Sequence, residues 1–535
     1  MSIQVHYKNK IFVILGIIAL ISIIVKLYSI NFDLPIYSDN FDIAMRSFAH
    51  LGGNFDVSPN RNFGLSLFQS PFLLLANSDN FLDYSNIIRL FGIGASTTSI
   101  FVMYLLARKF FSEKYSLVAA SLFAFSPQLN QSAGLGETEA LFLLSLMCSL
   151  YFILRQTNDK LVFLSFVFAG IAYTIRPMGM IMIIILLIIY LIHFRKNLKP
   201  PKFVFCIFLF ALIIIPISLV RYDQYDDPLF YGDVSKGFIT DYTMLRAVNI
   251  GSVSADEFIQ NNSVAAFLEQ FVLLGIFNYL KALLANSLPY LVILLPAGLL
   301  LSLKLKHEIK NFILANWILI TSYSLSMIIV SSIIIEPRYA MPLIPFLIII
   351  SVLPIQKISE LKTNFGNFKT MSFIIIMLLL LSSSVIYTYF VYPPPDYETE
   401  SEKIEFSRFL HNNLDGNFFN AGWSTHYFTY VYIVDNNSFK NYYLNDKISI
   451  ENSEIQWVRL YGTSVDEIIL AGEKLGLKYL VVEQQQTEYN FVDEIYDEAK
   501  LYSYLTKVFD SNEHGFENLQ VKIFKIDYKV FKGEQ

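Results

Sequence analysis

The sequence predicts a polytopic α-helical membrane protein with about 11 transmembrane helices and a small C-terminal extracytoplasmic α/β domain. The first observation is composition: the chain of 535 residues is 54% hydrophobic and only 16% charged. The second is a mean hydropathy of +0.47, which implies more apolar surface than one soluble core can bury. The third is an abrupt change after Val391, where prolines 393–395 lead into a polar segment.

The apolar runs that divide the first 391 residues are close to the roughly 20 residues needed to cross a bilayer. The first run, Ile11 to Ile30, is too long for the apolar core of a signal peptide, so we expect a retained helix. Segment 264–285 carries Glu269 and Lys281 and is predicted either as a surface helix or as a twelfth span. The predicted spans are 11–30, 87–107, 115–130, 138–154, 161–175, 177–194, 203–220, 287–303, 312–334, 339–354 and 371–391.

Lysine and arginine fall in alternate loops between these spans, in phase with Lys8 and Lys10, and acidic residues fill the opposite loops. Positive loops face the cytoplasm, so we expect a cytoplasmic N-terminus in the cell membrane. A first external loop 31–86, a large external loop 221–286 and the domain 392–535 then lie outside the membrane-spanning domain 1–391.

The segment after the prolines alternates helical and strand patterns. We expect helices over 400–413 and 464–475 and strands over 417–421, 478–483 and 521–527. The segment contains no glycine-rich phosphate loop and no His/Cys/Asp cluster, so its sequence assigns it no function.

Composition also excludes some classes of protein. The net charge of -5 provides no basic field, so no nucleic-acid partner is expected. The two cysteines, Cys148 and Cys206, lie in apolar runs, which is typical of core residues rather than of a disulfide or a metal site.

The densest group of polar residues is the stretch 35–71, directly after the first span. A carboxylate there, at Asp39 or Asp42, could act as a general base on an acceptor hydroxyl. Equally, Asp39 could cap a helix that begins at Asn40 or Phe41. The residue pattern does not decide between these two readings.

Glu137 and Glu139 stand at the outer mouth of the fourth predicted span. They would face opposite ways on a helix but the same way in an extended turn. An acidic pair at this place could hold a divalent cation or a polar acceptor; alternatively, both carboxylates stabilise the positive end of the following helix.

Arg176, in IRPMG, and Arg338, in EPRYAMP, lie at external helix edges. A planar guanidinium pairs well with phosphate, and two of them on the acidic side favour a lipid-phosphate site. The alternatives are a snorkelling arginine and pairing with Glu336. In the large external loop, Asp226, Asp227 and Tyr231 could line an acceptor site, although an exposed turn around Pro228 is the simpler explanation.

Four motifs resemble the GT-C superfamily of polytopic glycosyltransferases, particularly its protein O-mannosyltransferase and aminoarabinose-transferase-like branch. They are YSDNFD, GETEALF, IRPMG and EPRYAMPLIPF, and the similarity covers the architecture of residues 10–391. The resemblance implies a polyprenyl- or dolichyl-phosphate-linked sugar as donor and transfer of a hexosyl or pentosyl group on the outer face. It also implies roles for site residues: Asp39 as the catalytic carboxylate; Arg338, Tyr339 and Arg176 at the donor phosphate; Glu137, Glu139 and Asp42 at an acceptor or metal site.

The sequence departs from the motifs of two GT-C branches. Asn40 follows Asp39, so the Asp-Glu pair of the protein mannosyltransferases is absent. The Trp-Trp-Asp motif of oligosaccharyltransferases is also missing, and its nearest counterpart is Gly422-Trp423-Ser424. En bloc transfer to asparagine is therefore not expected.

The sequence thus predicts an inverting membrane glycosyltransferase of the cell envelope, with a protein, lipid or glycan as acceptor, membrane lipids around it and a divalent cation as the one cofactor considered. The competing prediction is a non-catalytic transporter or lipid-binding protein of polyprenyl-linked glycans. Such a protein places ionisable groups near the bilayer midplane and often contains an internal repeat. Here the spans are almost free of acids and no repeat is evident.

Overall fold

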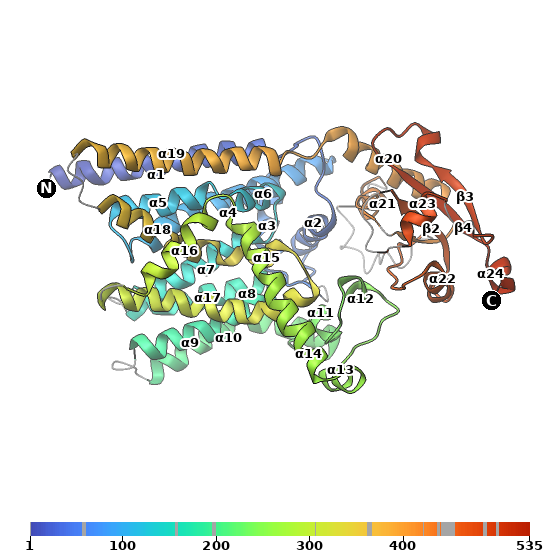
Figure 1. Ribbon diagram of the computed structural model, residues 1–535, viewed down its shortest axis with the longest axis horizontal. Helices are drawn as coiled ribbons and strands as arrows, with labels where there is room; N and C mark the ends of the chain where they lie inside the picture. Colours follow the sequence, from blue (N-terminus) through green and yellow to red (C-terminus); the bar gives the residue numbers. More distant parts are fainter. Residues whose placement is uncertain are drawn as a thin grey trace.

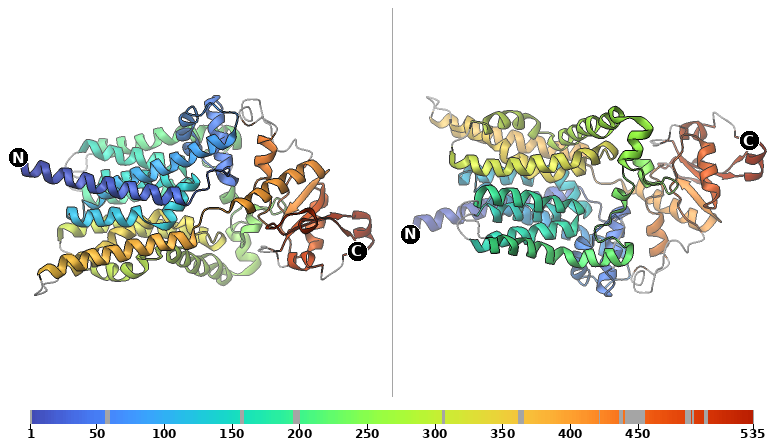
Figure 2. Two further views of the ribbon diagram at one scale, coloured as in Figure 1. Left: turned by 90° about the horizontal axis from the view of Figure 1, so that it is seen from above. Right: turned by 90° about the horizontal axis from the view of Figure 1, so that it is seen from below.

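The structure is a computed structural model of the chain. It describes residues 2–55, 60–155, 159–194, 200–304, 307–360, 366–420, 422–435, 439, 455–484, 489, 491–498 and 502–534. Helices 1 to 19 form an elongated bundle whose long members run along one axis, and the C-terminal part covers one end of it (Figure 1). The two further views place the C-terminal part at that same end (Figure 2).

The bundle contains long spanning helices, short apolar helices and the helices that cap its end. Among the described residues, seven helices are long and apolar enough to cross a membrane, or eight if one bent pair is a single span. The helices of this part are α1 (Ser2–Tyr28), α2 (Ser38–Leu51), α3 (Gly64–Leu73), α4 (Phe81–Ala107), α5 (Glu113–Ala124), α6 (Pro127–Leu135), α7 (Glu139–Ile153), α8 (Asp159–Ile175), η1 (Pro177–Gly179), α9 (Met180–Phe194), α10 (Pro200–Tyr225), α11 (Gly232–Ser235), α12 (Tyr242–Arg246), α13 (Ala255–Asn262), α14 (Val264–Leu268), η2 (Glu269–Leu274), α15 (Gly275–Ser287), α16 (Leu291–Ser302), α17 (His307–Ile333), η3 (Pro337–Tyr339), η4 (Met341–Leu343), α18 (Ile344–Glu360) and α19 (Gly366–Val391).

The structure differs from the prediction at span 115–130, and several other spans differ at their ends. The predicted span 115–130 is divided between α5 and α6, because the ring of Pro127 cannot continue a helix but suits the first position of a new one. Segment 264–285 belongs to a continuous helical stretch, Val264–Ser287, whose length and composition are those of a spanning helix. Both predictions for that segment, a surface helix or a twelfth span, stay predictions.

Lipid-facing and core helices differ in burial. In α18, 83% of the apolar window is buried among other helices, whereas in α19 only 11% is buried. The exposed surface of α19 is built from side chains such as Leu378, Leu379 and Phe390. Exposed apolar faces of this extent suit a hydrocarbon environment, so the chain is a multi-pass membrane protein.

Helix α2 is amphipathic and lies between the bundle and the C-terminal part. Phe41, Ala44, Met45 and Phe48 recur at helical spacing and are buried. They pack in one cluster with Ile433 of the C-terminal part. This apolar contact fixes the rotation of α2 and leaves the Asp39 side free to face the end of the bundle.

The C-terminal part is an α/β domain with a four-stranded sheet in the order β1-β2-β4-β3. Strands β1 and β2 are parallel, and the β2/β4 and β3/β4 pairs are antiparallel. Its elements are α20 (Tyr397–Asn413), β1 (Asn417–Asn420), α21 (Phe428–Val434), α22 (Val465–Glu473), β2 (Leu477–Glu483), α23 (Val492–Tyr496), β3 (Leu505–Asp510), η6 (Ser511–His514), β4 (Val521–Ile526) and α24 (Tyr528–Glu534).

The elements predicted for this domain are present within one to three residues at their described ends, although Ala421 lies outside the described residues. Strand β3 was not predicted. Most residues of this strand face solvent, so its sequence lacks the apolar run that identifies a buried strand.

A short joint connects the C-terminal domain to the loop after α12. The backbone N–H of Val248 donates to the carbonyl of Arg459 at 2.9 Å. Asn249 and Tyr461 exchange two hydrogen bonds of 2.9 Å, since the Asn249 amide donates to the Tyr461 carbonyl and accepts from its N–H. The joint holds the domain against the end of the bundle.

Candidate functional site

A cavity of about 720 Å³ opens where α2, the α6/α7 bend, the α8/η1 junction, α17 and η3 meet. Its lining contains both ionisable and apolar residues. The ionisable lining residues are Asp39, Arg61, Glu137, Glu139, Arg176, Asp227, Arg246, Arg338, and the tyrosines Tyr231 and Tyr339. This volume is large enough for a sugar headgroup, within the usual range for small-molecule sites.

Asp39 lies in the first turn of α2 and is held by two arginines. One Asp39 carboxylate oxygen forms an ion pair with Arg61. The other oxygen lies 3.3 Å from Nη1 of Arg338. The helix begins at Ser38 with Tyr37 at the N-cap and no side-chain capping bond, so capping is not the role of Asp39.

The two guanidinium groups determine the ionisation of Asp39. Burial would raise the pKa of this carboxyl, but Arg61 and Arg338 together lower it from 3.8 to about 2. The Asp39 side chain is still 44% exposed, because it faces the open cavity. Asp39 is therefore a carboxylate at every physiological pH and accessible to a ligand.

Asp42 lies one turn further along α2 and is absent from the cavity lining. Its carboxylate accepts from Nε of Arg46 at 3.2 Å and lies 3.4 Å from Nη1 of Arg61. Because it contacts Arg61, Asp42 orients the arginine that in turn pairs with Asp39. The acceptor or metal role of Asp42 stays a prediction. Asp42 contacts Arg61 and does not itself line the cavity.

Glu137 and Glu139 stand at the bend between α6 and α7, where the two helix axes differ by 120°. Gly136 ends α6 with φ of 75°, and an added Cβ would lie 2.9 Å from Ile88, so only glycine fits. Both glutamates follow this turn, Glu137 in the bend itself and Glu139 at the start of α7. Glu139 is buried and its Oε1 lies 2.7 Å from Nη1 of Arg176, while Glu137 lines the cavity.

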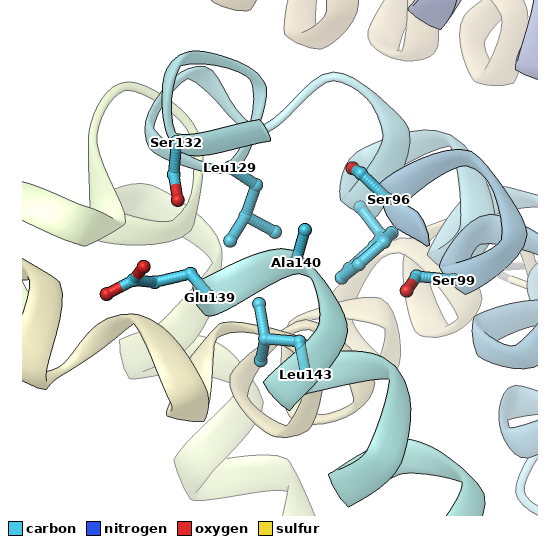
Figure 3. Close-up of a pocket in the computed structure, with 8 residues that line it drawn as sticks. Ser96, Ser99, Leu129, Ser132, Glu139, Ala140 and Leu143 are labelled. Carbon is cyan, nitrogen blue, oxygen red and sulfur yellow. The ribbon is translucent and has the colours of Figure 1, made fainter. Parts of the chain in front are cut away.

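A small second pocket lies behind Glu139, among the serines of α4 and α6 (Figure 3). It holds about 10 Å³, close to the space that one water molecule needs. Ser132 of α6 and Ser96 and Ser99 of α4 are buried in its lining.

Arg338 and Tyr339 belong to the single turn η3, which two neighbouring helices fix. Asn286 of α15 donates to the carbonyl of Pro337 at 2.6 Å, and Tyr323 of α17 donates to the carbonyl of Tyr339 at 3.2 Å. The Tyr339 ring lies between two guanidiniums, 5.8 Å from Arg176 and 5.6 Å from Arg338. Arg338 also forms an ion pair with Glu336, so the predicted alternative partner is present together with Asp39.

Three arginines at or beside the cavity were not among the sequence-predicted site residues: Arg61, Arg221 and Arg246. Arg61 donates to the Asp39 carbonyl at 2.8 Å in addition to pairing with its carboxylate. The buried Arg221 donates to Asn62 at 2.9 Å and to the Arg61 carbonyl at 3.2 Å, and so fixes the loop that carries Arg61. None of the three lies in a recognisable motif, and their position depends on long-range folding.

Part of the cavity lining is apolar. It includes residues from the end of α17 and from the η1/α9 junction, namely Met178, Ile181, Ile329, Val330, Ile333 and Ile334. A cavity lined by both arginines and aliphatic side chains fits an amphipathic ligand with an anionic head.

The fit to a metal ion is poor for the described side chains. They include no group of three or more His, Cys, Asp or Glu residues arranged to hold a cation. Two of the carboxylates in the cavity, Asp39 and Glu139, are already paired with arginine. The donor set therefore fits an anion better than a divalent cation.

The structure thus brings Asp39, Glu137, Glu139, Arg176, Arg338 and Tyr339 into one cavity. Asp227 and Tyr231 also line it, although an exposed turn was the simpler expectation; the turn exists too, since Asp227 accepts from the N–H of Leu229 at 2.9 Å. The roles assigned to these residues remain predictions.

Comparison with known proteins agrees with this architecture. Residues 72–219 match the family described as dolichyl-phosphate-mannose-protein mannosyltransferase. No curated protein sequence matches the chain. Among solved structures, the apo oligosaccharyltransferase of Archaeoglobus fulgidus superposes with a TM-score of 0.58 at 12% identity, covering 91% of this chain and 71% of that one.

Two further structures are similar. The A. fulgidus oligosaccharyltransferase AglB in complex with an inhibitory peptide and a dolichol-phosphate has a TM-score of 0.57 at 11% identity, covering 92% of this chain and 71% of that one. ArnT from Cupriavidus metallidurans, bound to undecaprenyl phosphate, covers 97% of this chain and 98% of its own at 12% identity and a TM-score of 0.48. The resemblance to the GT-C superfamily inferred from the four motifs is confirmed at the level of the fold.

Proposed function

We propose that the protein is a GT-C-type membrane glycosyltransferase that moves a sugar from a polyprenyl- or dolichyl-phosphate carrier to an acceptor hydroxyl. The observation that carries the proposal is the contact of Asp39 with Arg61 and Arg338 inside a 720 Å³ cavity. A carboxylate beside a group of arginines supplies both a proton acceptor and a phosphate site.

The donor enters with its isoprenoid chain against the aliphatic part of the lining and its phosphate toward Arg338 and Arg176. The family match and the structural neighbours support such a donor, since one neighbour was solved with a dolichol-phosphate. Transfer of a hexosyl or a pentosyl group is compatible with this cavity.

Asp39 takes the proton of the acceptor hydroxyl as the hydroxyl oxygen attacks the anomeric carbon of the donor sugar. The bond from that carbon to the phosphate oxygen breaks, and its electron pair leaves with the carrier phosphate. Attack opposite the leaving group inverts the anomeric centre. Binding of donor and acceptor in one cavity contributes by proximity and orientation.

A carboxylate with a pKa of about 2 is a weak base, and donor binding provides a way to strengthen it. The donor phosphate competes with Asp39 for Arg338 and Arg61. Once these guanidiniums bind phosphate, burial acts on Asp39 with less opposition and its pKa rises. The carboxylate then becomes a better proton acceptor at the moment the donor is in place.

Glu137 faces the cavity without the buried ion pair of Glu139, so we assign Glu137 to the acceptor side and Glu139 to the support of Arg176. A divalent cation, if the enzyme uses one, would be held through Glu137 and the substrate phosphate rather than through a cage of protein carboxylates.

The acidic loops and the C-terminal domain are assigned to the outer face, and the N-terminus to the cytoplasm. An impermeant maleimide should label the exposed variant Asp415→Cys in intact cells, because both native cysteines, Cys148 and Cys206, are buried. Labelling only after lysis would reverse the orientation.

The decisive experiment for the activity incubates purified protein with a panel of polyprenyl-phosphate sugars and a panel of hydroxyl-bearing acceptors (peptides, glycans and lipids) and measures released polyprenyl phosphate. Release that disappears in Asp39→Asn supports the transferase. A non-catalytic carrier protein would bind the lipid and release nothing, and that result would reject the proposal.

A further inference from the structure

The C-terminal domain presents an exposed tryptophan near the start of α2. Trp423 is 51% exposed, so the large apolar face of its indole ring is open to a ligand. The ring lies in the turn between β1 and α21, on the side of the domain that contacts α2.

The turn that carries Trp423 is held rigidly. The Glu483 carboxylate accepts from the N–H of Trp423 at 3.0 Å and from the N–H of Ser424. The same carboxylate occupies the space that a Cβ on Gly422 would need, which explains a glycine there. A ring fixed before binding loses little conformational entropy when a ligand packs on it.

Contacting rings connect Trp423 with the start of α2, the first pair edge-to-face and the second stacked. The Trp423 and His426 rings are 4.6 Å apart, and the His426 ring stacks on Tyr37 at 5.4 Å. Tyr37 is the N-cap residue of α2, two positions before Asp39. The aromatic ladder Tyr37–His426–Trp423 therefore runs from the proposed general base to an exposed end.

The ladder carries little charge of its own. Burial, followed by the nearby Lys403 and Arg459, lowers the pKa of His426 to about 4, although Asp39 acts in the opposite direction. The imidazole is therefore neutral at physiological pH and offers a ring face together with one donor and one acceptor nitrogen.

Cationic residues lie beside the ladder. Arg246 lines the cavity, and two residues later Val248 donates to the carbonyl of Arg459 at 2.9 Å. The Arg459 guanidinium lies 4.5 Å from the Trp457 ring, and the residue is exposed. Polar groups thus flank the aromatic faces at the joint between the domain and the bundle.

We infer that Trp423, His426 and Arg459 form an acceptor subsite for a saccharide, so that the proposed transferase extends a glycan. The apolar C–H face of a pyranose ring packs flat on an indole ring, while its hydroxyls bond to histidine and arginine at the edge. This inference rests on the proposed function and specifies its acceptor class.

A polypeptide acceptor fits this surface less well. An extended peptide commonly binds by adding a strand to a free sheet edge. On the outer side of β1, Phe418 already donates to the Gln456 carbonyl at 3.0 Å and accepts from Val458 at 2.8 Å. The sheet edge next to the aromatic ladder is therefore occupied by the chain itself.

The test measures binding of four free saccharides, mannotetraose, maltotetraose, cellotetraose and chitotetraose, to the purified full-length protein by isothermal titration calorimetry. At least one should bind, Trp423→Ala should weaken it by about tenfold or more, and Trp423→Phe should retain most of the affinity. Trp317→Phe is the matched control, because Trp317 lies in α17 and donates to Ser302 at 3.3 Å, away from the ladder.

Binding that is equal in Trp423→Ala and wild type, or no binding of any of the four saccharides, would overturn the inference. Release of polyprenyl phosphate is measured in parallel on the same samples. If release occurs and depends on Asp39 but no saccharide binds, the acceptor subsite is rejected and the transferase stands. If a saccharide binds at Trp423 without any release, the transferase is rejected and the saccharide site stands.

Discussion

Arg338 and Asp39 are 299 positions apart in the chain, yet Nη1 of Arg338 lies 3.3 Å from Oδ2 of Asp39. The contact joins the first polar loop to the turn ahead of α18. Asp39 belongs to α2 and Arg338 to η3, two elements that are far apart in the sequence. Only the folded bundle brings the two residues into contact. The function proposed for the cavity depends on this contact.

Asp39→Asn should reduce the release of carrier phosphate by at least about 100-fold, because an amide cannot accept the acceptor proton. Carrier release is measured with the donor that the wild type uses. The protein should remain folded, since Asn keeps the size of the side chain and the helix has no capping bond from this residue. Asp83→Asn is the control, an exposed acid in the first turn of α4. Equal turnover in Asp39→Asn and wild type would remove the catalytic assignment.

Arg338→Lys should raise the donor KM by roughly tenfold, because an ammonium cannot make the planar, forked contact of a guanidinium with phosphate. The effect should appear in donor KM more than in acceptor KM. Arg155→Lys, at an exposed position beyond the end of α7, should leave both constants unchanged. A donor KM that is insensitive to Arg338→Lys would place the phosphate elsewhere.

Glu139→Gln should destabilise the protein by roughly 3–5 kcal/mol, because it leaves Arg176 without its buried counter-charge. The Glu139 side chain is 2% exposed and that of Arg176 is 12% exposed, so water compensates little. Thermal unfolding of the detergent-solubilised protein measures the loss. The double variant Glu139→Gln/Arg176→Met should recover part of it, and strictly additive losses would contradict the ion pair.

The pH dependence of kcat/KM should report the ionisation of the Asp39 carboxyl. Because its folded-state pKa is about 2, below the ordinary 3.8, the carboxylate adds stability above the unfolded value and loses it as pH falls toward 2. Arg61→Met removes one lowering charge, so the pKa of Asp39 should rise and the acid limb of kcat/KM should move to higher pH. The profile of kcat/KM is recorded between about pH 3 and pH 8, where the wild type should show no acid limb from Asp39 because the pKa of this carboxyl is about 2. A profile of Arg61→Met that also lacks an acid limb in this range would disprove the coupling.

Glu483→Gln should raise the acceptor KM while donor KM stays constant, because the amide accepts more weakly from the N–H groups of Trp423 and Ser424. Glu513→Gln, on the far side of the sheet domain in η6, is the control. A change of donor KM instead would indicate a general disturbance of the domain.

The helical membrane architecture was predictable because apolar runs of bilayer length are a local signal. The limits of that signal are visible at Pro127, which divides a predicted span, and in Val264–Ser287, where two charged residues obscured a spanning-length helix. The C-terminal strands were predictable where they are buried, as at Leu477–Glu483, but not where they face solvent, as at Leu505–Asp510.

The site was predictable where a residue type stands out in an apolar context. Asp39, Arg176 and Arg338 are charged residues beside long apolar runs, and all three line the cavity. Arg61 was not assigned because its loop has no periodicity, and its position depends on Arg221, 160 residues away. The sequence likewise could not show whether Asp39 pairs with an arginine or caps a helix, because the answer depends on tertiary contacts.

The backbone joint between Val248, Asn249 and the 459–461 segment has a mechanical consequence. Arg246 lies on the cavity wall and Trp423 on the sheet domain. Because these hydrogen bonds link the two parts of the protein, an outward movement of one part would move the other. Binding of a bulky lipid in the cavity would then shift the position of Trp423. Binding of the donor would in this way influence binding of the acceptor.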